Sequence, residues 1–409
     1  MRVLQERLVM SKPILVIIIA ELFGTSLWFS ANSASDNLTK LWMLSTGDIG
    51  LLTNAVQLGF IVGTLFFSLS GWADKFPASK IFAFCSIFGA ILNGCFALLS
   101  EGLTSAIMFR FFVGVSLAGI YPLGMKLIVS WDPNAAGKNL GLLVGMLTLG
   151  TALPHGIRAV GADLSWQTVI LSSSVLALIA AIAIGILGDG PYLKNAPNKQ
   201  RIPFSNVIQA FRVPEFKSSA YGYFGHMWEL YSFWTIIPLL LLTLLSTDGA
   251  VAHENVSFLA FMVIGIGALG CIIGGWLSQS IGSGRVAWIA LFTSGVICLI
   301  YPFLNAISPN WKIFILLVWG FAVVADSPQF SAISAKACPQ ELVGTALTIQ
   351  NSIGFFITII SIFIVTFTFP YLGDMVAWLL LPGPIFGLFF MRGLVKEKQN
   401  LQFSQIKGN

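Results

Sequence analysis

Charged residues are scarce in this sequence. Only 10% of the 409 residues are charged, whereas soluble domains carry about 25%. Such a chain cannot cover a water-exposed surface, which excludes a soluble globular protein. Cysteines are also few: Cys85, Cys95, Cys271, Cys298 and Cys338 are scattered along the chain, which argues against a disulfide framework or a metal cluster. We expect them to pack as small apolar side chains.

The signatures of enzymes are missing as well. No nucleotide-binding loop, metal-ligand cluster or nucleophile with a paired base stands out. The first apolar run continues as a full span without a small-residue cleavage site, so no cleavable signal peptide is evident. The sequence therefore predicts a protein that is not an enzyme and has no catalytic residue, no cofactor and no metal site.

What the sequence does contain is a succession of apolar runs. Each is about 20 residues long, enough to cross a bilayer as a helix. The runs are continuous rather than alternating, which favours helices over barrel strands. The predicted spans are 13–32, 48–70, 81–100, 105–131, 139–160, 166–188, 218–245, 256–277, 286–305, 312–334, 342–368 and 374–391. This pattern predicts an all-α protein of the lipid bilayer with twelve transmembrane helices.

Basic residues are distributed unevenly between the joints. With both termini in the cytoplasm, the inner segments hold 17 Lys and Arg residues, and the outer loops hold only Lys40, Arg158 and Lys312. This is the positive-inside bias. The net charge of +5 thus reflects orientation and does not indicate nucleic acid binding. Short termini and bare loops are typical of a bacterial protein, so we predict a multi-pass inner-membrane protein with cytoplasmic termini, acting as a monomer.

A polar stretch at 189–217 divides the spans into six and six. The two halves match weakly at three places, namely Pro122 and Pro133 with Pro328 and Pro339, Trp72 with Trp276, and Glu21 with Glu229, at offsets of 206, 204 and 208. Three pairs near one offset indicate a duplicated unit, a common origin of transporter folds. We predict an N-terminal six-helix bundle (1–190), a cytoplasmic linker (191–215) and a pseudo-symmetric C-terminal six-helix bundle (216–409).

Short motifs resemble one transporter family. GWADKFPASK, after the second span, is similar to the loop Gly-x-x-x-Asp-Arg-x-Gly-Arg-Lys of the major facilitator superfamily, with Asp74, Lys75 and Lys80 on matching positions. The second-half copy, GGWLSQSIGSGR, keeps Arg285, and Arg110 in RFFVG resembles the fourth-helix arginine. RFFVGVSLAGIYPLGMK is distantly similar to nitrate/nitrite and cyanate permease-like members. The second and eighth spans lack the arginines of the nitrate carriers.

The resemblance implies a fold, a mechanism and a gate. The fold implied is that of the superfamily, in which helices one, four, seven and ten line a central cavity, and the mechanism implied is alternating access. The resemblance further implies that Asp74, Lys75, Lys80 and Arg285 form a gating latch between helices rather than a solute site.

Ionisable side chains inside the spans are the candidates for solute or proton binding. A charged side chain at the bilayer centre costs about 2.5–3.5 kcal/mol on insertion scales, so it faces protein or water and tends to be functional. At ~1.5 Å per residue, Glu21, Glu229 and Asp326 fall near the midplane. Because the halves are related by an axis along the membrane normal, we expect Glu21 and Glu229 to face each other across the cavity.

Neighbouring residues complete the candidate set. His226 and Glu229 are at i and i+3, hence on one helix face, and the aromatic run YGYFGHMWELYSFW around them can hold a solute by stacking or cation–π contact. The predicted solute- or proton-binding residues are Glu21, Arg110, Tyr121, Lys126, His226, Glu229, Asp326 and Gln329.

Together these features predict a secondary active transporter of a small polar or charged solute. A carboxyl group at the midplane favours its protonated form, so the acids can couple transport to a proton gradient. The fifth span lacks the Gly-Pro motif of the family's exporters, which favours uptake by symport. The alternatives are an exporter or antiporter of the same fold, a divalent-metal carrier and a non-transporting membrane sensor.

Overall fold

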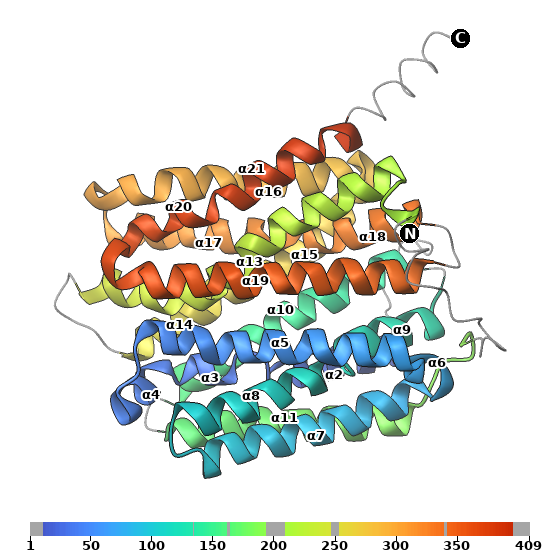
Figure 1. Cartoon of the computed structure of the whole chain (residues 1–409), viewed down its shortest axis with the longest axis horizontal. Coiled ribbons are helices and arrows are strands. Elements are labelled where there is room, and N and C mark those ends of the chain that lie inside the picture. Colours follow the sequence, from blue (N-terminus) through green and yellow to red (C-terminus); the bar gives the residue numbers. More distant parts are fainter. Residues whose placement is uncertain are drawn as a thin grey trace, which may run out of the picture.

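Helices running along one common axis make up the computed structural model (Figure 1), which describes residues 11–133, 135–161, 164–193, 209–246, 253–338 and 342–395. Ten described helices are long and apolar enough to cross a membrane. No strand occurs within these ranges. The chain is therefore an all-helical, multi-pass membrane protein, as its apolar runs predict.

The helices follow one another with short joints. Their bounds are α2 (Lys12–Thr25), α3 (Ser30–Ser33), α4 (Ser35–Trp42), α5 (Thr46–Ser70), α6 (Trp72–Lys75), α7 (Ala78–Leu99), α8 (Leu103–Leu117), α9 (Tyr121–Trp131), α10 (Ala136–Val160), α11 (Trp166–Leu187), α13 (Pro214–Ser246), α14 (His253–Gly265), α15 (Gly267–Ile281), α16 (Ser283–Ile300), η1 (Tyr301–Ala306), α17 (Pro309–Ala325), α18 (Ser327–Ala337), α19 (Val343–Leu372), η2 (Gly373–Val376), α20 (Ala377–Leu380) and α21 (Pro382–Phe390). Most of the predicted linker, residues 194–208, lies outside the described residues.

Breaks within helices explain why the bounds of the described helices differ from those of the predicted spans. The first predicted span, 13–32, is not one helix, because α2 ends at Thr25 and the chain continues through α3 and α4. Near the C-terminus, residues 343–390 form one apolar stretch of 48 residues, although the chain turns at Gly373, whose φ is 51°. Only glycine adopts this conformation without strain. The number of twelve spans stays a prediction.

Two further interruptions occur at prolines in the middle of spans. Pro122 is the second residue of α9, directly after the break from α8, and Pro328 is the second residue of α18, directly after the break from α17. Proline lacks the amide hydrogen that would continue the helix and clashes with the preceding turn. The sequence repeat therefore has a structural counterpart, because both breaks occur at the prolines that are 206 residues apart.

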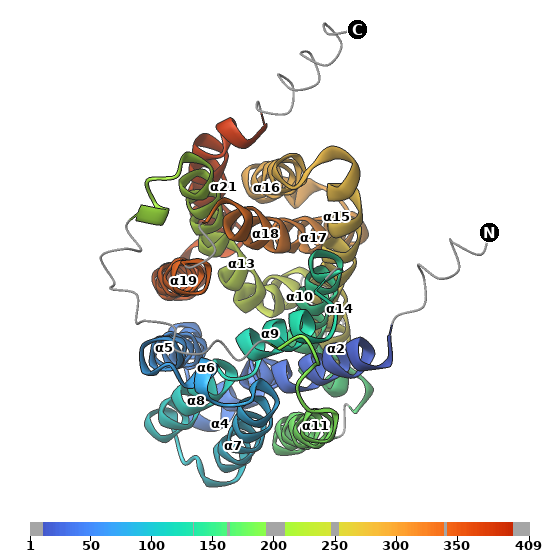
Figure 2. The same cartoon turned by 90° about the vertical axis from the view of Figure 1, so that its right-hand side faces the viewer.

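Helices that precede and follow the linker form two groups in space. Viewed end-on, most elements up to α11 lie in the lower part of Figure 2 and most from α13 onward lie in the upper part, with α10 and α14 side by side in the middle. The groups touch where α5 packs against α19 and where α10 packs against α14 and α15. We call the end at which α11 finishes and α13 begins the linker end, and the opposite end, where α5 begins, the far end.

Candidate functional site

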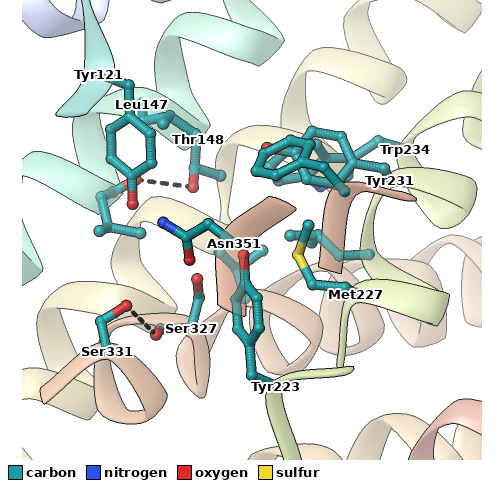
Figure 3. Close-up of a pocket in the computed structure, with 14 residues that line it drawn as sticks. Tyr121, Leu147, Thr148, Tyr223, Met227, Tyr231, Trp234, Ser327, Ser331 and Asn351 are labelled. Carbon is teal, nitrogen blue, oxygen red and sulfur yellow. Dashed lines mark hydrogen bonds between the residues drawn. The ribbon is translucent and has the colours of Figure 1, made fainter. Parts of the chain in front are cut away.

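A pocket lies where the two groups of helices meet (Figure 3). It holds about 420 Å³ of empty space, part of which opens to the outside. The lining residues are Tyr121, Val144, Leu147, Thr148, Tyr223, Met227, Leu230, Tyr231, Trp234, Val324, Ser327, Ser331, Asn351 and Phe355. They come from α9 and α10 on one side and from α13, α17, α18 and α19 on the other.

The polar groups of this wall are hydroxyls and one carboxamide. Figure 3 shows the hydroxyls of Tyr121, Tyr223 and Ser327 and the amide of Asn351 directed into the same space from α9, α13, α18 and α19. No hydrogen bond joins these four side-chain groups to the other lining residues drawn in the figure. Hydroxyls and amides both donate and accept hydrogen bonds, so this wall can bind a solute that carries hydrogen-bond donors or acceptors.

Aromatic rings close the pocket toward the far end. The ring centroid of Trp28 lies 5.6 Å from that of Tyr231 and 5.7 Å from that of Phe355. Phe60 lies 4.3 Å from Phe355, and Trp234 lies 5.1 Å from Tyr231. We call these five residues the aromatic cluster, and each is at most 4% exposed. Trp28 and Phe60 belong to the first helix group and the other three to the second, so the cluster bridges the groups.

Beyond the aromatic cluster, α5 and α19 touch directly in a contact that we call the far-end seam. Asn54 Nδ2 donates to the carbonyl of Ile359 at 3.0 Å, and Thr46 Oγ1 donates to that of Thr366 at 2.9 Å. Between them Gly50 faces Thr366 so closely that an added Cβ would lie 2.9 Å from Thr366 Cβ. The cluster and then the seam therefore follow the lining residue Asn351 along α19 toward the far end.

Glu21, the first predicted acid, lies outside the pocket wall. Its side chain is fully buried on α2, and neither carboxyl oxygen has a hydrogen-bond partner among the described residues. It packs against α9 at Gly124, where an added Cβ would lie 3.3 Å from the carboxyl carbon of Glu21 and closer still to Oε2. Glu21 is therefore a buried acid beside the helix that contributes Tyr121 to the pocket.

Glu229 points away from the pocket into its own helix group. Its carboxylate accepts hydrogen bonds from Trp319 Nε1 at 2.7 Å, Ser294 Oγ at 2.9 Å and Cys298 Sγ at 3.2 Å. These donors lie on α16 and α17. The expectation that Glu21 and Glu229 face each other across a shared cavity is thus wrong, because each acid is buried within its own group of helices and neither lines the pocket.

His226 and Asp326 form a buried pair directly behind the pocket wall. His226 Nδ1 lies 2.8 Å from Asp326 Oδ1, and both side chains are 1% exposed. Neither atom has a hydrogen-bond partner among the described residues, and the contact is an ion pair only when His226 is protonated. Asp326 directly precedes the lining residue Ser327, and Gln329 is buried without lining the pocket. No three His, Cys, Asp or Glu side chains gather as metal ligands in the described part of the chain.

Arg110 binds the break in the first span. Its Nη1 donates to the carbonyl of Leu27 and to Ser30 Oγ, both at 3.0 Å, and to Asn93 Oδ1 at 3.2 Å, and its Nη2 contacts the carbonyl of Trp28. Carbonyls at a helix break have lost their helical partners, and a charged donor is a strong replacement. Arg110 thereby fixes the backbone that presents Trp28 to the aromatic cluster.

Lys126 and the predicted latch lie at the linker end. Lys126 Nζ is 3.6 Å from Asp74 Oδ1, and both side chains are partly exposed. Lys75, Lys80 and Arg285 form no ion pair with residues that the structure describes. Lys126 is therefore engaged with the loop after the second span and does not line the pocket. The latch role of Asp74, Lys75, Lys80 and Arg285 stays a prediction.

Of the eight predicted site residues, only Tyr121 lines the pocket. The lining residues outside the predicted set are uncharged, and four of them, Tyr223, Tyr231, Trp234 and Phe355, are aromatic. On α13 they recur at helical spacing as Tyr223, Met227, Leu230, Tyr231 and Trp234, which places them on one face. That stripe was visible in the sequence as a possible signal. The ionisable residues of the same helix lie beside the stripe rather than on it.

Comparisons with known proteins agree with this architecture. A family model described as the Major Facilitator Superfamily matches residues 10–362. The chain is 23% identical over 356 residues to the 4-hydroxybenzoate transporter PcaK of Acinetobacter baylyi, covering 78% of this chain and 76% of the relative. It is 22% identical over 324 residues to the niacin transporter NiaP of the same organism, covering 69% of each.

The family match spans most of the chain. The narrower similarity to nitrate/nitrite and cyanate permeases stays a prediction. The chain belongs to the Major Facilitator Superfamily and is a transporter rather than an enzyme.

Proposed function

We propose that this protein carries a small organic solute with an aromatic ring across a bacterial inner membrane by alternating access. One observation carries the proposal: both helix groups line the pocket, and both contribute to the aromatic cluster that closes it. Rocking of one group against the other would separate Trp28 from Tyr231 and Phe355 and open the pocket at the far end. Rigid-body rocking around a fixed midplane site is the usual transport motion of such folds.

The proposal includes an architecture and an orientation. We take residues 1–190 and 216–409 as the two moving bundles, residues 191–215 as their linker, and the chain as a monomer with twelve crossings. The segment α2–α4 would supply the first crossing, and α20 with α21 would supply the twelfth. The positive-inside bias of the joints supports a cytoplasmic linker end, and hence a far end that faces outward.

The aromatic character of the solute is supported by two lines of evidence. The names of the two relatives specify 4-hydroxybenzoate and niacin, both of which are single rings with polar substituents. The pocket combines the rings of Tyr231, Trp234 and Phe355 with hydroxyl and amide groups. Aromatic rings stack on one another in offset or edge-to-face arrangements, so a planar solute fits this lining.

We further propose uptake by proton symport, with Glu21 as the proton-binding group. Glu21 is fully buried, and no hydrogen bond or ion pair with a described residue must break when it takes up or releases a proton. It packs against α9, which carries Tyr121 into the pocket. Movement of α9 would therefore change the surroundings of Glu21 and of the solute together.

The test is transport by the purified full chain in proteoliposomes. Radiolabelled nicotinate, nicotinamide and 4-hydroxybenzoate are offered with and without an inward proton gradient. We expect the gradient to drive accumulation of at least one of them. Glu21→Gln should keep solute counterflow but lose accumulation, whereas Glu101→Gln, at an exposed acid, should behave like the parent chain.

Each part of the proposal has its own contradicting result. Entry of all three solutes at the rate of empty vesicles would contradict an aromatic solute. Accumulation that persists in Glu21→Gln would contradict proton coupling at this residue. Solute that leaves vesicles as protons enter would reverse the direction and indicate antiport.

A further inference from the structure

We propose that the pocket selects uncharged planar aromatic solutes, such as aromatic carboxamides and phenols, over carboxylate anions and ammonium cations. The inference rests on the proposed function in taking this pocket as the solute site. It goes beyond the relatives, whose named solutes are both carboxylic acids.

The first argument is the chemistry of the wall. Among the described lining residues, no side chain is charged, and the polar ones offer hydroxyls or the carboxamide of Asn351. Moving an ion out of water into such surroundings is costly unless a partner of opposite charge compensates. A neutral solute avoids this cost, because hydroxyl and amide groups replace its hydrogen bonds to water.

The second argument is that the cations within the spans are engaged elsewhere. The guanidinium of Arg110 is fully buried, and it binds the carbonyls of Leu27 and Trp28. Lys126 pairs with Asp74 at the linker end. Neither cation lines the pocket, so a carboxylate in the pocket would have no counter-charge from the two residues that the sequence nominates for this role.

The third argument is that the buried carboxyl groups either contact other side chains or lie outside the pocket. Glu229 accepts three hydrogen bonds within the second helix group, and Asp326 lies against His226. Glu21 packs against Gly124, behind the wall. A cationic solute would therefore meet aromatic faces without a carboxylate. Attraction to ring faces alone offsets only part of the loss of hydration.

The remaining lining matches a neutral solute with a polar substituent. The rings of Tyr231, Trp234 and Phe355 provide surfaces for stacking. The Asn351 amide and the Tyr121 hydroxyl, which Figure 3 shows directed into the pocket, each donate and accept hydrogen bonds. A carboxamide or phenol presents the complementary groups without a charge.

Two triplets of similar ring compounds that differ in charge test the proposal with the full chain in detergent. The first is nicotinamide, nicotinate and 1-methylnicotinamide, which are neutral, anionic and cationic. The second is 4-hydroxybenzamide, 4-hydroxybenzoate and 4-hydroxybenzylammonium. Binding is followed by tryptophan fluorescence, because Trp234 lines the pocket and Trp28 closes it. We expect a neutral member to bind at least tenfold more tightly than both charged partners, which corresponds to about 1.4 kcal/mol.

A variant reverses the selectivity if the argument is correct. Asn351→Asp keeps the shape of the side chain but places a carboxylate in the wall, so 1-methylnicotinamide should become the preferred member of its triplet. Asn255→Asp introduces the same charge at an exposed position of α14 and should leave the order unchanged. A charged member that binds most tightly to the parent chain would overturn the proposal, as would the absence of binding by both neutral members at millimolar concentration.

Counterflow in proteoliposomes separates this proposal from the proposed function. Neutral members that bind but do not exchange across the membrane would contradict transport and leave the selectivity intact. Charged members that exchange faster than neutral ones would overturn the selectivity and leave transport intact.

Discussion

The far-end seam offers a direct test of whether the closed far end opens. Gly50 of α5 faces Thr366 of α19, and an added Cβ would lie 2.9 Å from Thr366 Cβ. Gly50→Ala therefore inserts a methyl group where the closed seam has no room. Thr366→Gly removes the Cβ, Oγ1 and Cγ2 atoms that the methyl group would meet, so the double variant should restore the fit.

The size of the effect follows from the contact. Overpacking by one methyl group in a tight interface costs about 1–3 kcal/mol. In the proposed motion α5 and α19 separate when the far end opens, so the cost arises only while the seam is closed. Gly50→Ala should thus shift the population toward the open far end by a factor of about 5–150.

Labelling of a buried cysteine measures this shift. Ile362→Cys places a thiol on α19, one turn before Thr366, at a position that is 0% exposed. A membrane-impermeant maleimide is added to the far side, and the parent chain without this cysteine gives the background. We expect Gly50→Ala to raise the labelling rate, and Gly50→Ala with Thr366→Gly to return it to the rate of Thr366→Gly alone.

A control and two contradicting results complete the design. Gly94→Ala adds the same methyl group where the nearest atom is 3.7 Å away, so it should leave the rate unchanged. Unaltered labelling in Gly50→Ala would refute the reasoning that the seam limits opening. Equally fast labelling in the double variant would show that the methyl group acts elsewhere than at Thr366.

Two further predictions concern buried charges that stabilise the fold. Arg110→Lys should lower the free energy of unfolding in detergent by about 1.5–3 kcal/mol, because one ammonium group cannot replace the planar guanidinium at two carbonyls. Arg158 forms a partly exposed ion pair with Asp36 at 3.2 Å. Arg158→Lys keeps that charge and should cost under about 1 kcal/mol, and equal costs in the two variants would contradict the role of Arg110. Glu229→Gln should lower the free energy of unfolding by about 1–3 kcal/mol, because the amide nitrogen of the new side chain would face hydrogen-bond donors. Glu21→Gln breaks no hydrogen bond within the described chain, so it should change the free energy of unfolding far less.

The sequence predicted the membrane helices well because lipid imposes a simple rule. A span must be apolar for about 20 residues, so α11 (Trp166–Leu187) almost coincides with the predicted 166–188, and α5 (Thr46–Ser70) with 48–70. The rule says little about where a helix breaks. Carbonyls freed at a break can be satisfied by a distant side chain, as Arg110 does at the end of α2, and that partner cannot be identified from hydropathy.

The site was harder to predict for a related reason. A charged residue within a span needs a hydrogen-bond or ion-pair partner, and that partner can be another protein side chain instead of a solute. Glu229 finds Trp319, Ser294 and Cys298 within its own helix group. Helix α13 is buried on nearly every side, so apolar periodicity cannot show which face meets the pocket. The aromatic residues do not show it either, because Tyr221, Phe224, Trp228 and Phe233 point elsewhere than the pocket.

The helix breaks connect the sequence repeat to the pocket. Tyr121 is the first residue of α9 and Ser327 is the first residue of α18. Each directly precedes one of the two prolines that are 206 residues apart, and both line the pocket. A proline at this point leaves the carbonyl four residues earlier without its helical partner, and in the second half Cys271 Sγ lies 3.5 Å from that carbonyl, on Val324.

In an uninterrupted helix, the direction of these side chains would be set by the axis of the preceding segment. A break allows the following segment to take a different axis, and therefore to direct its first side chain into the pocket. The duplicated proline thus delivers one hydroxyl group from each half to the same pocket. This explains why the pocket wall is polar at its centre without being charged. Under the proposed alternating access, a hydroxyl at a helix break can bond water or solute in both states, whereas a charge there would need a partner in both.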